Sequence, residues 1–117
     1  MRLALALFGL AAGIPATAQA QTEPVPIQPQ RWITNADYPA EALRTLQRGV
    51  VWFRLDVDAQ GKVVRCTITQ SSNSPLLDKT TCGAMRRSAR FQPATDASGA
   101  KVAGSWSSRF SWSIPGA

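Results

Sequence analysis

Apolar and polar residues alternate with a period of two in three segments of this chain, which is the pattern of strands that bury one face. In the first segment, four apolar residues share one face: Val51, Phe53, Leu55 and Val57. In the second, Val64, Cys66 and Ile68 share a face. The sequence "DAQG" at 58–61 separates the two segments, and its glycine can take the positive φ angle that turns require. The two segments therefore predict a β-hairpin.

The third alternating segment lies near the C-terminus. Its larger side chains alternate with serines and Arg109, and the positions on its apolar face are Trp106, Ser108, Phe110, Trp112 and Ile114. The turn-rich sequence "ATDASGAK" at 94–101 precedes it. This segment predicts a third strand.

A long helix is predicted between the second and third strands, within residues 74–91. Ser74 suits the N-cap and Pro75 the first helical position. Asp78 lies near the start, and arginines lie near the end, so the charges complement the helix dipole. Cys82 falls on the side that faces the sheet.

A short helix is predicted before the first strand, within residues 37–49. Pro39 suits its first position and Gly49 its stop. Ala42, Leu43 and Leu46 form one narrow apolar stripe.

The order helix, strand, strand, helix, strand predicts an α+β fold with two layers. A right-handed crossover places the last strand beside the first, so a three-stranded antiparallel sheet with strand order 2-1-3 follows, covered on one face by the long helix. Both outer strands are edges, and an open edge can pair with an extended segment of a partner by β-augmentation.

The N-terminal residues have the features of an export signal. Arg2 is followed by an uncharged, mostly apolar run at 3–14, and "AQA" at 18–20 is a small-x-small cleavage site. We expect a signal peptide at 1–20, with an uncleaved inner-membrane anchor as the alternative. Residues 21–34 form a proline-rich lead, either extended or a disordered tail, and 35–115 the domain. These features predict an exported protein.

Composition excludes several classes of function. The chain has 117 residues, a formal charge of +6 and no histidine. Its two cysteines, Cys66 and Cys82, are too few for a closed zinc site and lack C-x-x-C spacing. In an exported domain they favour a disulfide over two free thiols. Neither a G-x-S-x-G elbow nor a suitable pair of carboxylates is present, so we expect no enzyme, cofactor or metal. Because the chain carries an export signal, we expect no nucleic-acid partner despite its basic charge.

Several spaced landmarks resemble the TonB C-terminal domain family: "YPA" at 38–40, "GVV" at 49–51, "DVDAQGKV" at 56–63, "MRRSARFQPA" at 85–94 and the closing alternating strand. The resemblance implies a two-layer fold whose last strand pairs with the "TonB box" peptide of an outer-membrane receptor. It also implies energy supplied by the ExbB–ExbD complex when the protein is anchored at its N-terminus.

The resemblance implies where a partner binds. The docking strand consists of Gly104, Ser105, Trp106, Ser107, Ser108, Arg109, Phe110, Ser111 and Trp112. Asn35 takes the position, three before Tyr-Pro, where the family often has glutamine. Trp52 and Arg54 alternate outward on the face without a helix, and we expect them to form a second contact or to pack under the lead.

Three roles remain open at this stage. The first is a stand-alone periplasmic module that binds a receptor peptide, because the segment before the domain differs from the anchor and long spacer of the family's energy transducers. The second is a structural domain that homodimerises through the same edge and transduces no energy. The third is a basic surface that binds anionic polymers of the envelope.

Overall fold

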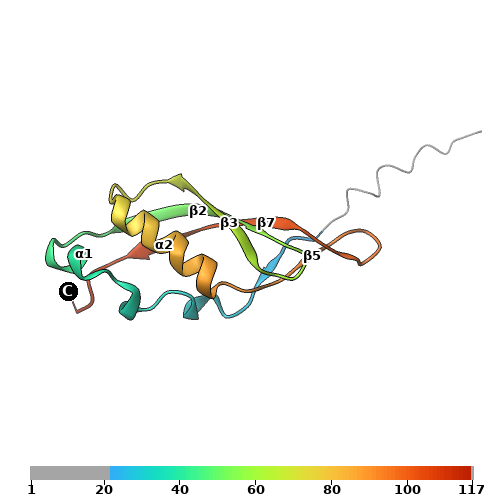
Figure 1. Ribbon diagram of the computed structural model, residues 1–117, viewed down its shortest axis with the longest axis horizontal. Helices are drawn as coiled ribbons and strands as arrows, with labels where there is room; N and C mark the ends of the chain where they lie inside the picture. Colours follow the sequence, from blue (N-terminus) through green and yellow to red (C-terminus); the bar gives the residue numbers. More distant parts are fainter. Residues whose placement is uncertain (1–21, 117) are drawn as a thin grey trace, which may run out of the picture.

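The computed structural model describes residues 22–116 (Figure 1). Its strands and α-helices, in chain order, are β1 (Val25–Pro26), α1 (Ala40–Arg44), β2 (Gly49–Val57), β3 (Val63–Gln70), α2 (Pro75–Ser88), β4 (Phe91–Gln92), β5 (Ala94–Thr95), β6 (Lys101–Val102) and β7 (Gly104–Trp112). Two 3-10 turns, η3 (Pro29–Arg31) and η4 (Asn35–Asp37), precede α1.

The central sheet has the strand order β3-β2-β7, and both pairs of neighbours are antiparallel. Helix α2 lies across one face of this sheet (Figure 1). The predicted α+β class, with an antiparallel sheet and a helix, is confirmed. Two additional two-stranded pairs, β1-β4 and β5-β6, were not predicted from the sequence.

The helix α2 begins where its capping residues dictate. The Ser74 hydroxyl accepts a hydrogen bond from the Leu77 amide at 3.1 Å, and Pro75 occupies the first turn. The sheet-facing side of the helix is buried, and the Trp112 indole donates to the Thr81 hydroxyl at 2.8 Å. This bond ties α2 to β7 across the core.

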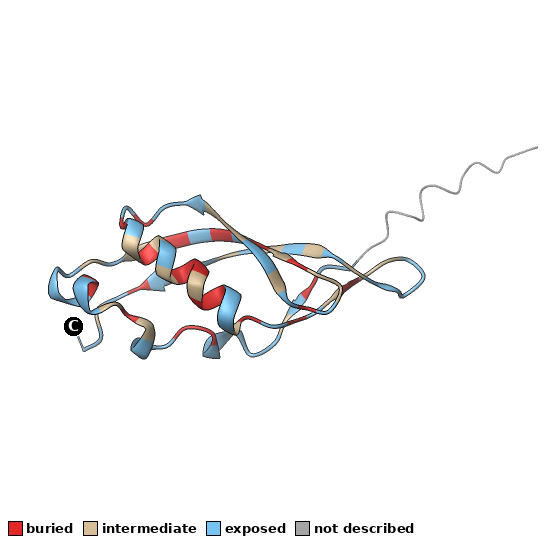
Figure 2. Cartoon of the chain, viewed as in Figure 1, coloured by how far each residue is buried: buried red, intermediate tan, exposed pale blue. Residues whose placement is uncertain are grey.

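The core lies between α2 and the inward face of β2 (Figure 2). The four alternating residues of β2 have at most 1% of their surface exposed, and they are Val51, Phe53, Leu55 and Val57. The period of two in the sequence therefore identified the buried face of the central strand.

The predicted disulfide is present between Cys66 on β3 and Cys82 on α2, with a Cα–Cα distance of 5.6 Å. Cys66 lies opposite Leu55 on the inward face, so the bond joins the sheet to the helix layer. It closes a loop with a sequence separation of 16.

The prediction that Val64 faces inward with Cys66 and Ile68 was wrong. A β-bulge lies here, because Asp56 pairs with Arg65 whereas the next residue, Val57, pairs with Val63. The extra residue is Val64, which is 62% exposed. Val63 packs against the core in its place.

The details predicted for the short helix were also wrong in part. Helix α1 ends at Arg44, and the left-handed residue after it is Leu46, with φ 54°, whereas Gly49 begins β2. Of the predicted apolar stripe only Ala42 is buried; Leu43 and Leu46 are 37% and 64% exposed. A helix this short is too small to bury a full stripe.

The lead is packed against the domain rather than merely extended. Its strand β1 pairs with β4, and the Ile27 amide donates to the Arg90 carbonyl at 2.9 Å. After η3, Trp32 and Ile33 are buried in the core, ahead of the domain start predicted at residue 35. Aromatic packing therefore extends the folded unit into the lead.

The predicted signal peptide at 1–20 lies outside the described residues. No helix within 22–116 combines the length and apolar composition that a bilayer crossing requires.

Candidate functional site

The two edges of the central sheet differ in regularity. Edge strand β3 pairs with β2 through two register shifts, one of them the bulge at Val64. Edge strand β7 pairs with β2 over nine residues without a shift, from Gly104 opposite Val57 to Trp112 opposite Gly49. Bulges protect an edge from further pairing, because they twist it and displace its hydrogen-bonding groups. Within the described residues, β7 is therefore the edge better suited to receive another strand.

The side chains of β7 alternate between the two faces of the sheet. The inward row packs against the N-terminal segment: Trp106 contacts Trp32 with ring centroids 5.8 Å apart, and Trp112 contacts Tyr38 at 5.0 Å. The outward row is exposed and consists of Ser105, Ser107, Arg109 and Ser111. The aromatic side chains thus fix the strand from one side and leave its outer face open.

The outward face of the sheet brings the predicted second contact next to β7. Trp52 lies opposite Arg109, and the Arg109 guanidinium carbon is 5.2 Å from the Trp52 ring centroid, a cation–π contact. Arg54 lies opposite Ser107 and is 3.7 Å from Asp56. Trp52 remains 39% exposed, so the lead does not cover it.

A small groove of about 90 Å³ flanks the C-terminal half of β7. It is lined by Ile33, Thr34, Asn35, Tyr38 and residues 110–113. Asn35 lies 75 positions before Phe110 in the sequence. The structure nevertheless brings it to the edge of the sheet formed by the predicted docking strand. Asn35 begins η4, where the Thr34 hydroxyl accepts from the Ala36 amide at 3.3 Å and the Thr34 amide donates to Asp37 at 2.9 Å.

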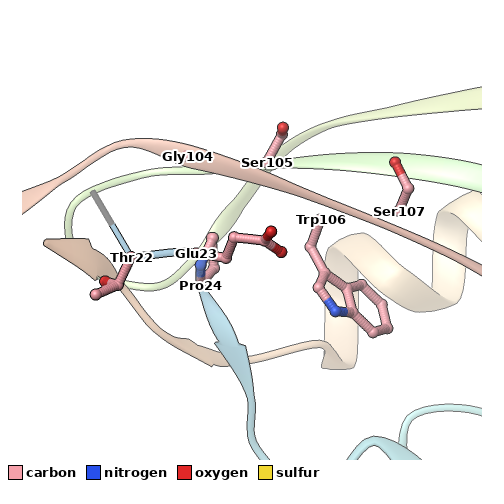
Figure 3. A pocket seen from close by; sticks show the side chains of 7 residues that line it. All are labelled: Thr22, Glu23, Pro24, Gly104, Ser105, Trp106 and Ser107. Carbon is pink, nitrogen blue, oxygen red and sulfur yellow. The ribbon is translucent and has the colours of Figure 1, made fainter. Parts of the chain in front are cut away.

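A larger groove of about 600 Å³ flanks the N-terminal half of β7 (Figure 3). Thr22, Glu23 and Pro24 line one side, and residues 104–107 line the other. A Cβ atom on Gly104 would lie 3.1 Å from the Pro24 ring, so this proline covers the inner side of the strand's first residue. Gly104 and Asn35 therefore belong to grooves at opposite ends of the predicted site.

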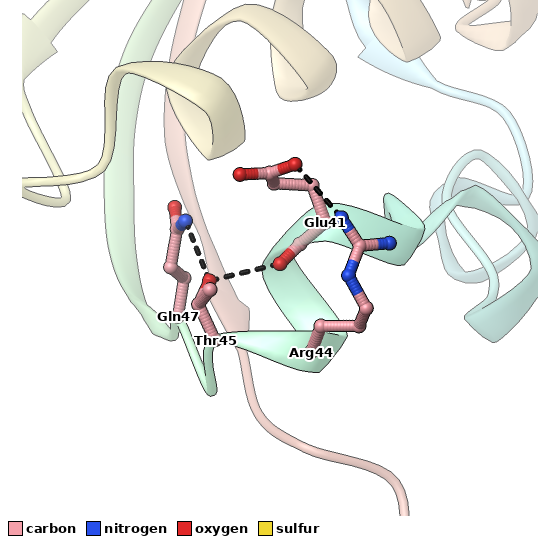
Figure 4. Close-up of polar contacts among 4 residues, drawn as sticks. All are labelled: Glu41, Arg44, Thr45 and Gln47. Carbon is pink, nitrogen blue, oxygen red and sulfur yellow. Dashed lines mark hydrogen bonds and ion pairs between the residues drawn. The ribbon is translucent and has the colours of Figure 1, made fainter.

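A polar network at the end of α1 holds the wall of the smaller groove (Figure 4). The Thr45 hydroxyl donates to the Glu41 carbonyl at 2.8 Å and accepts from the Gln47 side-chain amide at 2.9 Å. The Tyr38 hydroxyl donates to the Gln47 carbonyl, and the Ser74 hydroxyl donates to the Gln47 side-chain oxygen. The network thus connects Tyr38 to the start of α2.

A second network supports the loop between β3 and α2. Asp78 accepts hydrogen bonds from the Ser71 and Ser72 hydroxyls and from the Ser72 amide. Burial alone would raise the pKa of Asp78, but the hydrogen bonds from Ser71 and Ser72 outweigh it and lower the pKa. The carboxylate is thus kept charged as an acceptor for this loop.

Sequence reasoning missed the residues that precede the domain in the chain. Ile33 and Thr34 line the smaller groove and residues 22–24 line the larger one, yet this part of the sequence has no periodic pattern. A signal was present in the adjacent apolar pair Trp32 and Ile33, which is unusual for a solvated tail.

The side chains around β7 indicate what kind of ligand this edge suits. Within residues 22–116, no group of three or more cysteine, aspartate or glutamate side chains is arranged to hold a metal ion. The predicted docking strand offers main-chain groups, four serines, one arginine and aromatic side chains. These groups suit binding to another polypeptide.

The sequence was compared with known protein families. The family model described as the Gram-negative bacterial TonB protein C-terminal domain matches residues 34–114, which include η4, α1, the central sheet and α2. No curated protein matches the chain.

Proposed function

The chain belongs to the TonB C-terminal domain family, a non-enzymatic family of periplasmic interaction domains with a role in coupling energy to transport, and we propose that it binds an extended peptide by pairing it with β7. The partner is a segment of a TonB-dependent outer-membrane receptor. The observation that carries this proposal is the unbroken nine-residue pairing of β7 at an open edge, whereas the opposite edge of the sheet, β3, is bulged.

The side chains around β7 support the proposal. Its inner row is fixed by Trp32 and Tyr38, so the edge needs little ordering when a partner binds. The main chain of the docked peptide pairs with the nine residues of β7. One peptide side chain contacts Asn35, and others contact Trp52 and Arg54 on the outward face of the sheet.

We propose further that the protein is exported by a signal peptide at 1–20 and acts in the periplasm. Residues 21–34 lead into the domain at 35–115. If residues 1–20 are instead retained as an inner-membrane anchor, the ExbB–ExbD complex is the expected source of energy.

A peptide titration tests the proposal. Addition of a synthetic TonB-box peptide to the ¹⁵N-labelled chain should shift the backbone amides of Gly104–Trp112, whereas a scrambled peptide should not. Replacing Asn35 by alanine removes one hydrogen-bonding group, so we expect the affinity to fall about two- to tenfold. The matched control, Gln70→Ala on the β3 edge, should leave the affinity unchanged. The absence of shifts at millimolar peptide would refute the proposal.

A second candidate function is homodimerisation through the same edge, without energy transduction. One feature favours it: Arg109 is the single charged residue within β7, so two antiparallel copies of this strand meet little charge repulsion. Sedimentation at micromolar concentration separates the candidates, because a stable dimer would occlude β7 and prevent peptide binding.

A further inference from the structure

The larger groove beside β7 carries a single negative charge in a chain of net charge +6. Among the seven described residues that line the groove, Glu23 alone is ionisable. Its carboxylate makes no hydrogen bond or ion pair with any residue in 22–116. A basic protein thus presents an unpaired acid at the edge where a partner strand is proposed to dock.

The fold holds Glu23 in place through both of its neighbours. The Thr22 amide donates to the Thr95 carbonyl at 2.9 Å, and the Thr95 amide donates back to the Thr22 hydroxyl at 2.9 Å. On the other side, Pro24 is buried beneath Gly104. The backbone at Glu23 is therefore positioned by the pairing of the lead with β5 and by the packing of Pro24 against β7.

The opposite wall of the groove is an aromatic ring in a fixed position. Trp106 packs edge-on against Trp32 and Phe91, with ring centroids 5.8 Å and 5.3 Å apart. Figure 3 shows that the Glu23 side chain and the Trp106 ring lie on the same side of β7, whereas the Ser105 and Ser107 hydroxyls point to the other side. A carboxylate beside an indole ring is the combination that binds an ammonium or guanidinium group, through an ion pair and a cation–π contact.

We propose that this groove binds one basic side chain, lysine or arginine, of the peptide that docks on β7. The inference rests on the proposed function, because a strand paired with β7 directs every second side chain to the face where Glu23 and Trp106 lie. The occupant is a partner residue because the groove opens along the unpaired edge of the strand. The contact determines the register of the peptide along β7, because this groove lies at one end of the strand only. The smaller groove, at the other end, has a different lining.

A lysine scan tests the inference. The probe is a heptapeptide of alternating threonine and valine, in which a single lysine is placed at each position in turn; matched peptides carry norleucine at the same position. Titrations follow the amides of 104–112 in the full chain. At one position lysine should bind roughly three- to tenfold more tightly than norleucine, the gain expected for one exposed ion pair with a cation–π contact. Glu23→Gln should abolish this gain, and the same change at an acid that does not line this groove, Glu41→Gln, should preserve it.

The outcomes separate the two proposals. If the peptides shift the amides along β7 but no position prefers lysine, or if the preference survives in Glu23→Gln, the basic subsite is wrong and the docking edge stands. If neither lysine nor norleucine peptides shift any amide of 104–112, the docking edge itself is wrong and the subsite is wrong with it.

Discussion

Breaking the Cys66–Cys82 disulfide should remove a large part of the stability of this domain. The change is made in two ways, by chemical reduction of the native chain and by the double substitution Cys66→Ala and Cys82→Ala. Both routes remove the same covalent link between β3 and α2. They should therefore give similar losses.

The size of the loss follows from the loop that the bond closes. With a sequence separation of 16, the chain-entropy estimate for closing such a loop in the unfolded state is about 3 kcal/mol at 25 °C. A domain of this size has a free energy of unfolding of roughly 5–15 kcal/mol. The bond thus supplies between a fifth and more than half of the total.

Urea unfolding followed by tryptophan fluorescence measures the effect, because Trp32 and Trp112 are buried in the core. The midpoint should fall, and the dependence on urea should steepen because the unlinked chain exposes more surface on unfolding. A loss below about 1 kcal/mol by both routes would refute the reasoning, since it would show that the unfolded chain is not constrained by the bond.

Three further perturbations test the fold around the site. Trp32→Ala should cost about 3–5 kcal/mol in urea unfolding, because the lead packs into the core, whereas the exposed Trp52→Ala should cost under about 1 kcal/mol; equal costs would contradict the packing of the lead. Gly61→Ala and Gly99→Ala both strain a positive φ, but a Cβ on Gly61 would collide with the Phe91 carbonyl oxygen, whereas a Cβ on Gly99 would meet open space. Thermal denaturation should therefore show Gly61→Ala to be worse by more than about 2 kcal/mol, and similar melting temperatures would contradict this close approach. Because folding lowers the pKa of Asp78 from its ordinary 3.8, its contribution is present above that pH and is lost as pH falls through the lower folded value; the native chain should lose more stability on acidification than Asp78→Asn, and parallel pH profiles would contradict this.

The sequence predicted those parts of the fold in which burial follows a regular period. Strand β2 buries every second residue, so Val51 and Leu55 were assigned to the core correctly. Val64 was assigned wrongly because a bulge shifts the alternation by one residue, and periodicity alone does not reveal a bulge. A bulge depends on how a strand pairs with its neighbour, so it cannot be predicted from the sequence of that strand alone.

The candidate site was predicted only in part for a similar reason. The alternation at 104–112 located β7, but the grooves beside it are built by the N-terminal segment. Trp32 and Glu23 lie in a proline-rich stretch without periodicity, and their positions depend on pairing with residues 90–95, far along the chain. Asn35 entered the site through the family resemblance, and the structure places it beside Phe110 and Trp112.

Hydrogen exchange of the β7 amides, measured by NMR with and without a TonB-box peptide, tests the central claim most directly. A paired edge strand directs alternate amides away from its neighbour. The account predicts that every second amide of Gly104–Trp112 gains protection when the peptide binds, while the amides of Val63–Gln70 on the bulged edge exchange as before. Unchanged exchange along β7 in a peptide-bound sample, or new protection on β3 instead, would contradict it.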